Sequence, residues 1–231
     1  MSPAPASARR SAEASASASS REASDARAKK CSCTTAAVPR RRAWSSPAST
    51  IRRGSGCVPE GLDIQIEQAA GRALVSLRVA RGAAADAVHR LHLAPPLSAA
   101  GDDPQSLWLG PDHWLLASRR QTAPSMVERC EADLSGVLHN AVDQSAAFSV
   151  LRVAGRDVLD VLASGAALDF RESGFPPGGC RPTRFAEVAA AIVRTGTDEF
   201  EIYVDRGYGR YLRDWLEDTA RIAERAVGRD G

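Results

Sequence analysis

Lysine is almost missing from this sequence of 231 residues. The two lysines, Lys29 and Lys30, stand side by side near the N-terminus, and residues 59–231 contain none. A Schiff base with pyridoxal phosphate and the phosphate contact of a P-loop both need a lysine side chain. Both enzyme classes are therefore excluded for residues 59–231.

Long apolar runs and paired cysteines are also lacking. No stretch approaches the about 18 consecutive apolar residues that indicate a membrane-spanning helix, so we expect no membrane span. The five cysteines are an odd number, and three of them (Cys31, Cys33 and Cys57) fall in the first 58 residues. This pattern does not fit a disulfide framework, and we expect a reducing, cytoplasmic setting.

Charge is distributed unevenly along the chain. Residues 1–58 hold eleven basic and three acidic side chains, a net charge of +8, so residues 59–231 carry −6. The first segment consists mainly of Ala, Ser and Arg and cannot bury enough apolar surface to offset its ordering entropy, so we predict a disordered tail. The acidic remainder argues against nucleic-acid binding, which needs basic side chains to neutralise phosphates.

Three readings of the tail stay open. Its composition, rich in Arg and Ser and poor in acids, superficially fits an organelle transit peptide. An upstream extension of the reading frame without a function fits better. In the third reading the protein is an adaptor whose basic tail touches RNA or an acidic membrane.

Residues 59–231 are predicted to form a single α+β domain with two similar halves, at about 59–140 and 141–225. Leu-Arg-Val-Ala occurs at 77–80 and again at 151–154, and a helix-compatible segment follows each copy. Each half continues with a hairpin and an amphipathic helix, which indicates a duplicated strand, helix, hairpin and helix. Short connections favour mostly antiparallel sheets with helices packed on them over a doubly wound parallel sheet.

Hydrophobic periodicity places the faces of these elements. Phe200, Ile202 and Val204 alternate with Glu201 and Tyr203, so we predict a strand with one face buried and the other in solvent. Helices are predicted near 124–134 and 208–222. Six apolar residues at helical spacing are expected to pack the second helix on a sheet: Tyr208, Tyr211, Leu212, Trp215, Leu216 and Ile222.

Catalytic signatures are missing, since Gly-x-Ser-x-Gly, His-Glu-x-x-His and Gly-x-Gly-x-x-Gly do not occur. Asp86, His89 and His92 follow one another at steps of three and could hold a metal, but solvent exposure is the better interpretation. Asp198, Glu199 and Glu201 could form an acid-base pair, yet a solvated strand edge fits them better. We predict no catalytic, cofactor-binding or metal-binding residue.

The Gly-rich segment before Cys180 offers two further candidates. An adjacent arginine could activate the Cys180 thiol, but a buried structural thiol is the better interpretation. Gly178 and Gly179 with Arg181 and Arg184 could form an anion site from backbone amides and cations.

Three tryptophans could either pack in the core or anchor a partner. Trp108 and Trp114 flank the hairpin turn at 110–112, and Trp215 belongs to the helical stripe. Core packing is the first explanation. A tryptophan beside a Pro-rich loop is also a common interface anchor, so a partner interface is predicted at five residues: Trp108, Trp114, Pro176, Pro177 and Arg184.

Four segments together resemble the gamma subunit of heterotetrameric sarcosine oxidase. They are LWLGPDHWLL at 107–116, LRVAGRDVLDVLASGAALDF at 151–170, FPPGGCRPT at 175–183 and DEFEIYVDRGYGRYLRDWL at 198–216. This family is in turn similar to the folate-binding fold of the glycine-cleavage T-protein. The sequence departs from the family pattern at Ser164-Gly165-Ala166 and at Gly207.

The resemblance implies an accessory subunit with no cofactor of its own. The complex would demethylate sarcosine oxidatively to glycine, with FAD, FMN and NAD in partner subunits and tetrahydrofolate as the one-carbon acceptor. Its partners would be the alpha, beta and delta subunits. The alternative is a free-standing folate-binding one-carbon protein, in which a cavity between the halves holds a pterin against a carboxylate.

Overall fold

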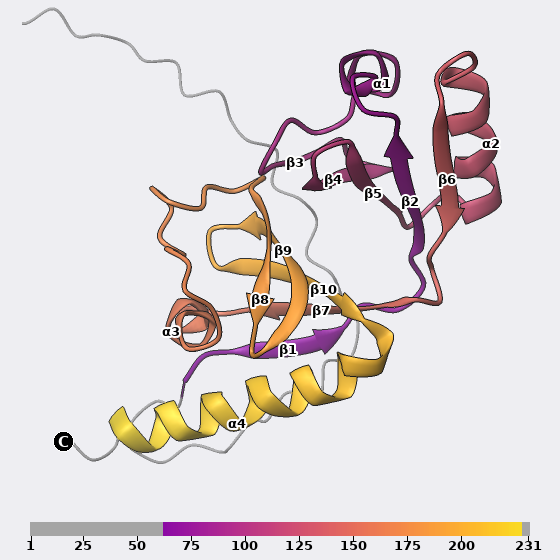
Figure 1. Ribbon diagram of the computed structural model, residues 1–231. Coiled ribbons are helices and arrows are strands. Elements are labelled where there is room, and N and C mark those ends of the chain that lie inside the picture. The colour runs from indigo at the N-terminus through magenta and orange to yellow at the C-terminus, as the bar shows by residue number, and fades with distance from the viewer. Residues whose placement is uncertain (1–61, 228–231) are drawn as a thin grey trace, which may run out of the picture. The chain divides into compact units, whose positions relative to one another are not determined.

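The computed structural model describes residues 62–227 (Figure 1). The predicted tail and its boundary at residue 58 lie outside this range. None of the helices between residues 62 and 227 has the length and apolar content to cross a membrane. The described elements, in chain order, are β1 (Gln65–Gln68), β2 (Ala73–Val79), α1 (Ala84–Leu91), β3 (Ala99–Ala100), β4 (Gln105–Gly110), β5 (His113–Ser118), α2 (Ala123–Asp133), β6 (His139–Asp143), β7 (Phe148–Ala154), α3 (Val158–Ala163), β8 (Cys180–Phe185), β9 (Val188–Gly196), β10 (Glu199–Asp205), the 3₁₀ turn η1 (Arg206–Tyr208) and α4 (Gly209–Val227).

The strands of residues 62–227 form two five-stranded antiparallel sheets. The first sheet has the order β3-β4-β5-β2-β6 and the second has the order β8-β9-β10-β7-β1. Tight turns close the β4–β5 and β9–β10 hairpins. In the turn between β4 and β5, Asp112 adopts a positive φ of 56°. The predicted α+β class with antiparallel sheets is confirmed.

The two sheets repeat one arrangement. In each, a strand next to the edge of the sheet leads through a helix to a hairpin and a second helix, as β2-α1-β4-β5-α2 and as β7-α3-β9-β10-α4. The edge strands next to β2 and β7 come from different places in the sequence. β6 comes after the other strands of its sheet, whereas β1 comes before all other strands of the described chain and pairs with β7. The strand pairing therefore crosses the predicted division near residue 140.

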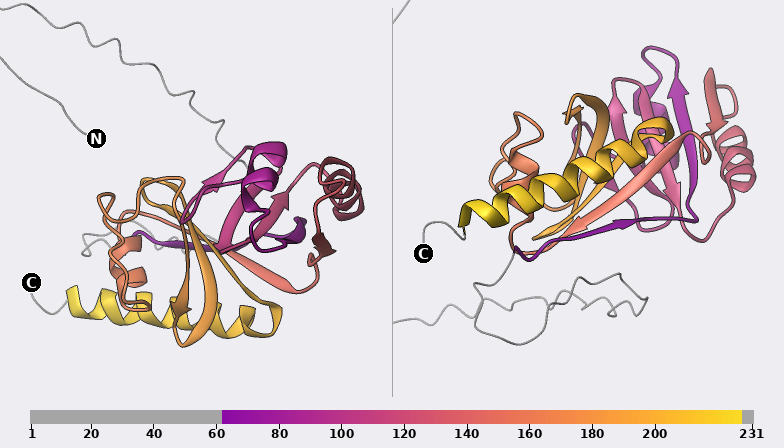
Figure 2. Two further views of the ribbon diagram at one scale, coloured as in Figure 1. Left: turned by 45° about the horizontal axis from the view of Figure 1, so that its top comes forward. Right: turned by 90° about the horizontal axis from the view of Figure 1, so that it is seen from below.

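Helices cover the outer faces of the sheets, and the inner faces meet each other (Figure 2). The helices α1 and α2 pack on the first sheet, and α3 and α4 pack on the second. Between the sheets, Leu74 and Leu115 of the first sheet pack with Val150, Val193 and Tyr203 of the second. Both faces of the central strands are thus buried, which leaves little room for a solvated strand face.

The last helix follows its predicted pattern only in part. Leu212 and Leu216 are fully buried against the second sheet, whereas Tyr208, Tyr211 and Ile222 are 51%, 45% and 66% exposed. Tyr208 belongs to the 3₁₀ turn before α4 and so is not on the α-helical stripe. The expectation that all six apolar residues pack on the sheet is wrong, because the buried stripe is narrower than the apolar pattern.

Candidate functional site

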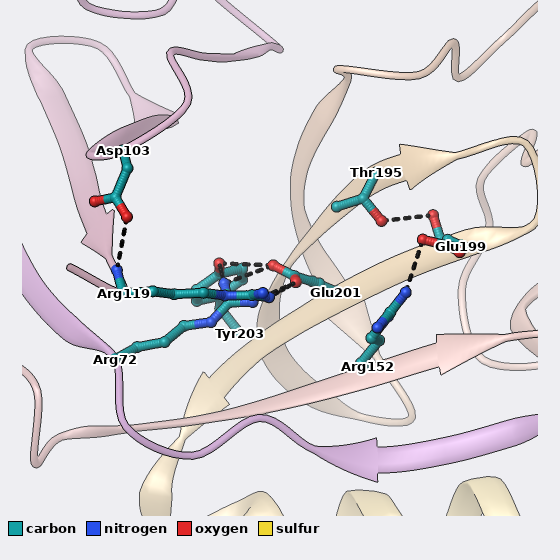
Figure 3. Close-up of polar contacts among 8 residues, drawn as sticks. All are labelled: Arg72, Asp103, Arg119, Arg152, Thr195, Glu199, Glu201 and Tyr203. Atoms are coloured by element: carbon teal, nitrogen blue, oxygen red, sulfur yellow. Dashed lines mark hydrogen bonds and ion pairs between the residues drawn. The ribbon is translucent and has the colours of Figure 1, made fainter. Parts of the chain in front are cut away.

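Charged side chains cluster between the two sheets (Figure 3). Arg72, which precedes β2, donates from Nη1 to Glu201 Oε2 on β10 at 2.7 Å and from Nη2 to Glu201 Oε1. Tyr203, two residues along the same strand, donates its hydroxyl to Glu201 Oε2 at 3.0 Å. Arg72 and Glu201 each expose 6% of their side chains. We call these three residues the inter-sheet cluster.

Arg119, just after β5, extends this cluster towards solvent. Its Nη2 donates to Glu201 Oε1 at 3.2 Å, and 45% of its side chain is exposed. Its backbone N–H donates to Asp103 Oδ2 at 3.3 Å. Both Glu201 carboxylate oxygens therefore accept hydrogen bonds from groups within the chain.

The ionisation states of the cluster follow from these contacts. Burial opposes ionisation of Glu201, but the hydrogen bonds and charge of Arg72 hold the pKa of Glu201 below its usual value. Burial, and then the negative charge of Glu201, raise the pKa of Tyr203. At neutral pH the cluster contains a guanidinium, a carboxylate and a neutral phenol. Because no member titrates near neutral pH, the cluster is suited to holding the sheets together and not to moving protons.

The expectation that Glu201 lies on a solvated strand edge is wrong. The Glu201 residue is 4% exposed because the first sheet covers this face of β10. Glu199 does lie towards the surface, where its carboxylate pairs with Arg152 at 3.0 Å, apart from the inter-sheet cluster (Figure 3). The local alternation of apolar and polar residues gave no signal for this burial, because it is the pattern of a strand with one solvated face. Arg72, the partner of Glu201, lies 129 positions away and has no local signal.

Cys180 is a buried thiol, as predicted. It is fully buried between the sheets, its Sγ donates to the carbonyl of Trp108 at 3.3 Å, and burial raises its pKa to about 12. The adjacent Arg181 opposes this shift but does not outweigh burial. The thiol therefore stays protonated at neutral pH, in the form that does not act as a nucleophile.

The tryptophans pack against the core to different degrees. Trp114 is 3% exposed and donates from Nε1 to the carbonyl of Ala94 at 2.9 Å, so it offers no surface to a partner. Trp108 is half-buried on the helix-covered face of the first sheet. Trp215 is half-buried against Phe185, with ring centroids 5.4 Å apart. Core packing accounts for the whole Trp114 side chain and for the buried parts of Trp108 and Trp215.

Two loops from different halves pair beside β8. The Leu97 carbonyl accepts from Cys180 N at 3.0 Å, and the Gly178 carbonyl accepts from Ala99 N at 2.7 Å. We call residues 95–98 and 176–179 the loop pair. It presents an exposed apolar surface made of Pro95, Pro96, Leu97, Pro176 and Pro177.

The arginines near the loop pair are already engaged. Arg181 donates to the carbonyls of Leu97, Cys180 and Gly174, and its guanidinium lies 4.8 Å from the ring centroid of Phe175. Arg184 is exposed and pairs with Glu187 at 3.1 Å. Both guanidinium groups of the possible anion site at Gly178 and Gly179 thus already have hydrogen-bond or ion-pair partners within the chain.

Asp86, His89 and His92 are all exposed on or next to α1, in line with the solvent-exposed interpretation. His92 is the C-terminal cap of the helix and adopts a left-handed φ of 52°. Over residues 62–227, no three His, Cys, Asp or Glu side chains come together as a metal site.

Comparison with protein families gives a match over residues 78–222, more than half of the chain, to the sarcosine oxidase gamma subunit family. The chain belongs to this family. The four segments that carry the resemblance in the sequence all fall inside the matched residues.

A curated member of the gamma subunit family is similar in sequence. Sarcosine oxidase subunit gamma of Corynebacterium sp. (strain U-96) is 28% identical over 113 residues, which cover 49% of this chain and 54% of that protein. The chain thus matches about half the length of this relative.

Two solved structures share the fold. Heterotetrameric sarcosine oxidase from Corynebacterium sp. U-96, in complex with pyrrole 2-carboxylate, matches with a TM-score of 0.61 and 24% identity, covering 68% of this chain and 84% of that one. Aminomethyltransferase T of the glycine cleavage system from Bartonella henselae matches with a TM-score of 0.52 and 17% identity, covering 68% and 46%. The predicted similarity between the gamma subunit family and the T-protein fold is confirmed.

Proposed function

We propose that this chain is an accessory gamma subunit of a heterotetrameric sarcosine oxidase. The observation that carries the proposal is the match of residues 78–222 to the gamma subunit family. In this role the alpha, beta and delta subunits are its partners and hold FAD, FMN and NAD. The complex demethylates sarcosine to glycine and passes the one-carbon unit to tetrahydrofolate.

The ionisable groups between the sheets support a role without catalysis. Glu201 is engaged by Arg72, Arg119 and Tyr203, and Cys180 is held as a buried, protonated thiol. A general base or a nucleophile must reach a substrate in its reactive form. These groups stabilise the fold and leave the redox chemistry to flavin-bearing partners.

The loop pair is the surface we assign to docking on the alpha subunit. Its five exposed apolar residues come from both halves of the chain, and proline and leucine lose little conformational entropy on binding. Trp108 lies next to it, because its backbone N–H donates to the carbonyl of Ser98 at 3.1 Å. Of the five interface residues predicted from the sequence, Pro176 and Pro177 belong to this surface, and Trp108 is joined to it through its backbone.

Capture of the full-length chain from its native cells tests the proposal. A tagged chain should co-purify with flavin-bearing subunits that mass spectrometry identifies, and the complex should oxidise sarcosine. Leu97→Glu and Pro177→Glu should each weaken capture at least about tenfold, as expected for central interface residues. Leu138→Glu is the matched control, because Leu138 is 78% exposed on another surface. Flavin or sarcosine oxidation in the isolated chain would contradict the proposal.

The free-standing folate-binding alternative is less well supported. It needs a carboxylate between the halves that is free to accept hydrogen bonds from a pterin. Glu201 lies between the halves, but both of its oxygens are occupied by residues of the chain. Calorimetry of the isolated chain with tetrahydrofolate separates the two functions, since only the alternative expects heat of binding.

A further inference from the structure

A polar groove lies outside the inter-sheet cluster, where the start of α4 meets the second sheet. Its volume is about 560 Å³, and residues of β1, β7, η1 and α4 line it. The helix α4 packs along β7 (Figure 2), so the groove has a floor of strand residues and a wall of helix residues. Neither the proposed subunit role nor the loop pair uses this surface.

Ser149 on β7 is a largely buried residue whose side chain lines this groove. The Ser149 residue is 7% exposed, and its side chain faces Gly209, the first residue of α4, so closely that a Cβ at position 209 would lie 2.4 Å from Ser149 Oγ. Within residues 62–227, no other group of the chain forms a hydrogen bond with Ser149 Oγ, and this oxygen is not one of the fully enclosed atoms that lack a partner. Because this oxygen borders the groove and has no partner in the described part of the chain, it is available to a ligand there.

The arginines of the groove are only partly neutralised. Arg210 lies 3.7 Å from Asp214 at an exposed site, and Arg213 lies 3.1 Å from Glu217. Arg206 has no ion-pair partner in the part of the chain that the structure describes. Three arginines against two carboxylates leave one net positive charge, and the N-terminus of the 19-residue α4 adds to the positive potential.

We propose that this groove binds a carboxylate group, with Ser149 Oγ and the Arg206 guanidinium as its donors. A planar guanidinium matches a carboxylate with two parallel hydrogen bonds. One net positive charge balances a singly charged carboxylate, whereas a phosphate dianion would stay under-neutralised. The carboxylate can belong to a free organic acid or to an acidic side chain of a protein partner.

Nuclear magnetic resonance titration of the full-length chain tests this site. The probes are acetate, inorganic phosphate and a short peptide of alternating Glu and Gly. We expect acetate or the peptide to shift the amide signals of Ser149, Arg206 and Gly209. Ser149→Ala and Arg206→Gln should each weaken binding by about tenfold, as for the loss of a hydrogen bond to a charged group.

The controls distinguish the two possible sources of the bound carboxylate, a free organic acid and an acidic side chain of a protein partner. Arg184→Gln removes an exposed arginine elsewhere and should leave binding unchanged. Peptide binding at least tenfold tighter than acetate identifies a protein partner as the source, and equal binding per carboxylate identifies a free acid. Phosphate binding tighter than acetate overturns the assignment, as does binding that both variants leave unchanged or the absence of any shift.

Discussion

Arg72 Nη1 lies 2.7 Å from Glu201 Oε2, and this ion pair links the start of β2 in the first sheet to β10 in the second. Both side chains are almost completely buried. In a buried ion pair, a strong mutual attraction opposes a large cost of desolvating the two charges. Removing one partner leaves an uncompensated buried charge. The pair therefore ties the folding of one half to its packing on the other.

Glu201→Leu should lower the free energy of unfolding by about 3–5 kcal/mol, because Arg72 then keeps a buried charge with no carboxylate. Urea denaturation measures the change. Glu187→Gln is the matched control: it breaks an exposed pair whose side chains are 73% and 89% exposed, and should cost less than about 1 kcal/mol.

The double variant Arg72→Met with Glu201→Leu tests whether the unpaired charge of Arg72 causes the loss of stability in Glu201→Leu. Replacing both charges by apolar groups removes the unpaired charge, so the double variant should be more stable than Glu201→Leu alone. If the double variant loses as much free energy of unfolding as Arg72→Met and Glu201→Leu lose together as single variants, the ion pair between Arg72 and Glu201 is contradicted.

Acid should destabilise the protein through the same carboxylate. The pKa of Glu201 is lower in the folded state than in the unfolded chain, so its contribution is present above the unfolded pKa of about 4.3 and is lost as the pH falls through the folded pKa. Urea denaturation at a series of pH values below about 4.3 should show stability falling more steeply in the wild type than in Glu201→Gln. Parallel profiles would contradict this assignment.

Alkali should destabilise the protein through Tyr203. Burial and the charge of Glu201 raise its pKa in the folded state, so its contribution is present below the unfolded pKa of about 10 and is lost above it. Tyr203→Phe should reduce the loss of stability above about pH 10. Some loss should persist, because burial also raises the pKa of Cys130 to about 11 and that of Cys180 to about 12.

The sequence was sufficient for the repeated order of elements because that order depends on local signals. Turn residues at 110–112 and 195–198 mark the hairpins, and the apolar alternation of Val75, Leu77 and Val79 marks β2. These signals act within a few residues of one another, so they need no knowledge of the tertiary structure.

The inter-sheet cluster could not be predicted in the same way. Alternation in β10 places Glu201 and Tyr203 on one face, and local pattern alone assigns that face to solvent. The face is buried because a second sheet stacks on it, and the first sheet's contribution comes from residues far away in the sequence. The same limit applies to Arg206 and Ser149, which the pairing of β10 with β7 and the packing of α4 bring to one groove.

Native Cys130 and Cys180 should resist alkylation. Both are buried, and burial raises their pKa values to about 11 and about 12, so the reactive thiolate is scarce at pH 8. Peptide mapping after iodoacetamide treatment should show both unmodified in the native chain and fully modified in urea. Rapid native modification of Cys180 would contradict its structural role and revive its role as a nucleophile.

Gly209→Ala should destabilise the protein although the backbone at this position is ordinary. Gly209 has helical φ and ψ of −57° and −44°, which alanine adopts readily, but the new Cβ would lie 2.4 Å from Ser149 Oγ and 2.6 Å from Ser149 Cβ. Relieving that overlap should cost about 1–3 kcal/mol. Gly110→Ala is the control, because a Cβ there meets nothing within 4 Å.

Ser149→Gly removes both atoms that the new methyl group meets. In that background Gly209→Ala should cost less than in the wild type, and the better helix propensity of alanine, about 1 kcal/mol, should offset part of what is left. A double-mutant cycle from urea denaturation measures the coupling between positions 149 and 209. If Gly209→Ala lowers the free energy of unfolding equally in both backgrounds, the close approach of α4 to β7 is not the reason for glycine at position 209. The contact between Ser149 and Gly209 then does not form the floor of the polar groove at the start of α4.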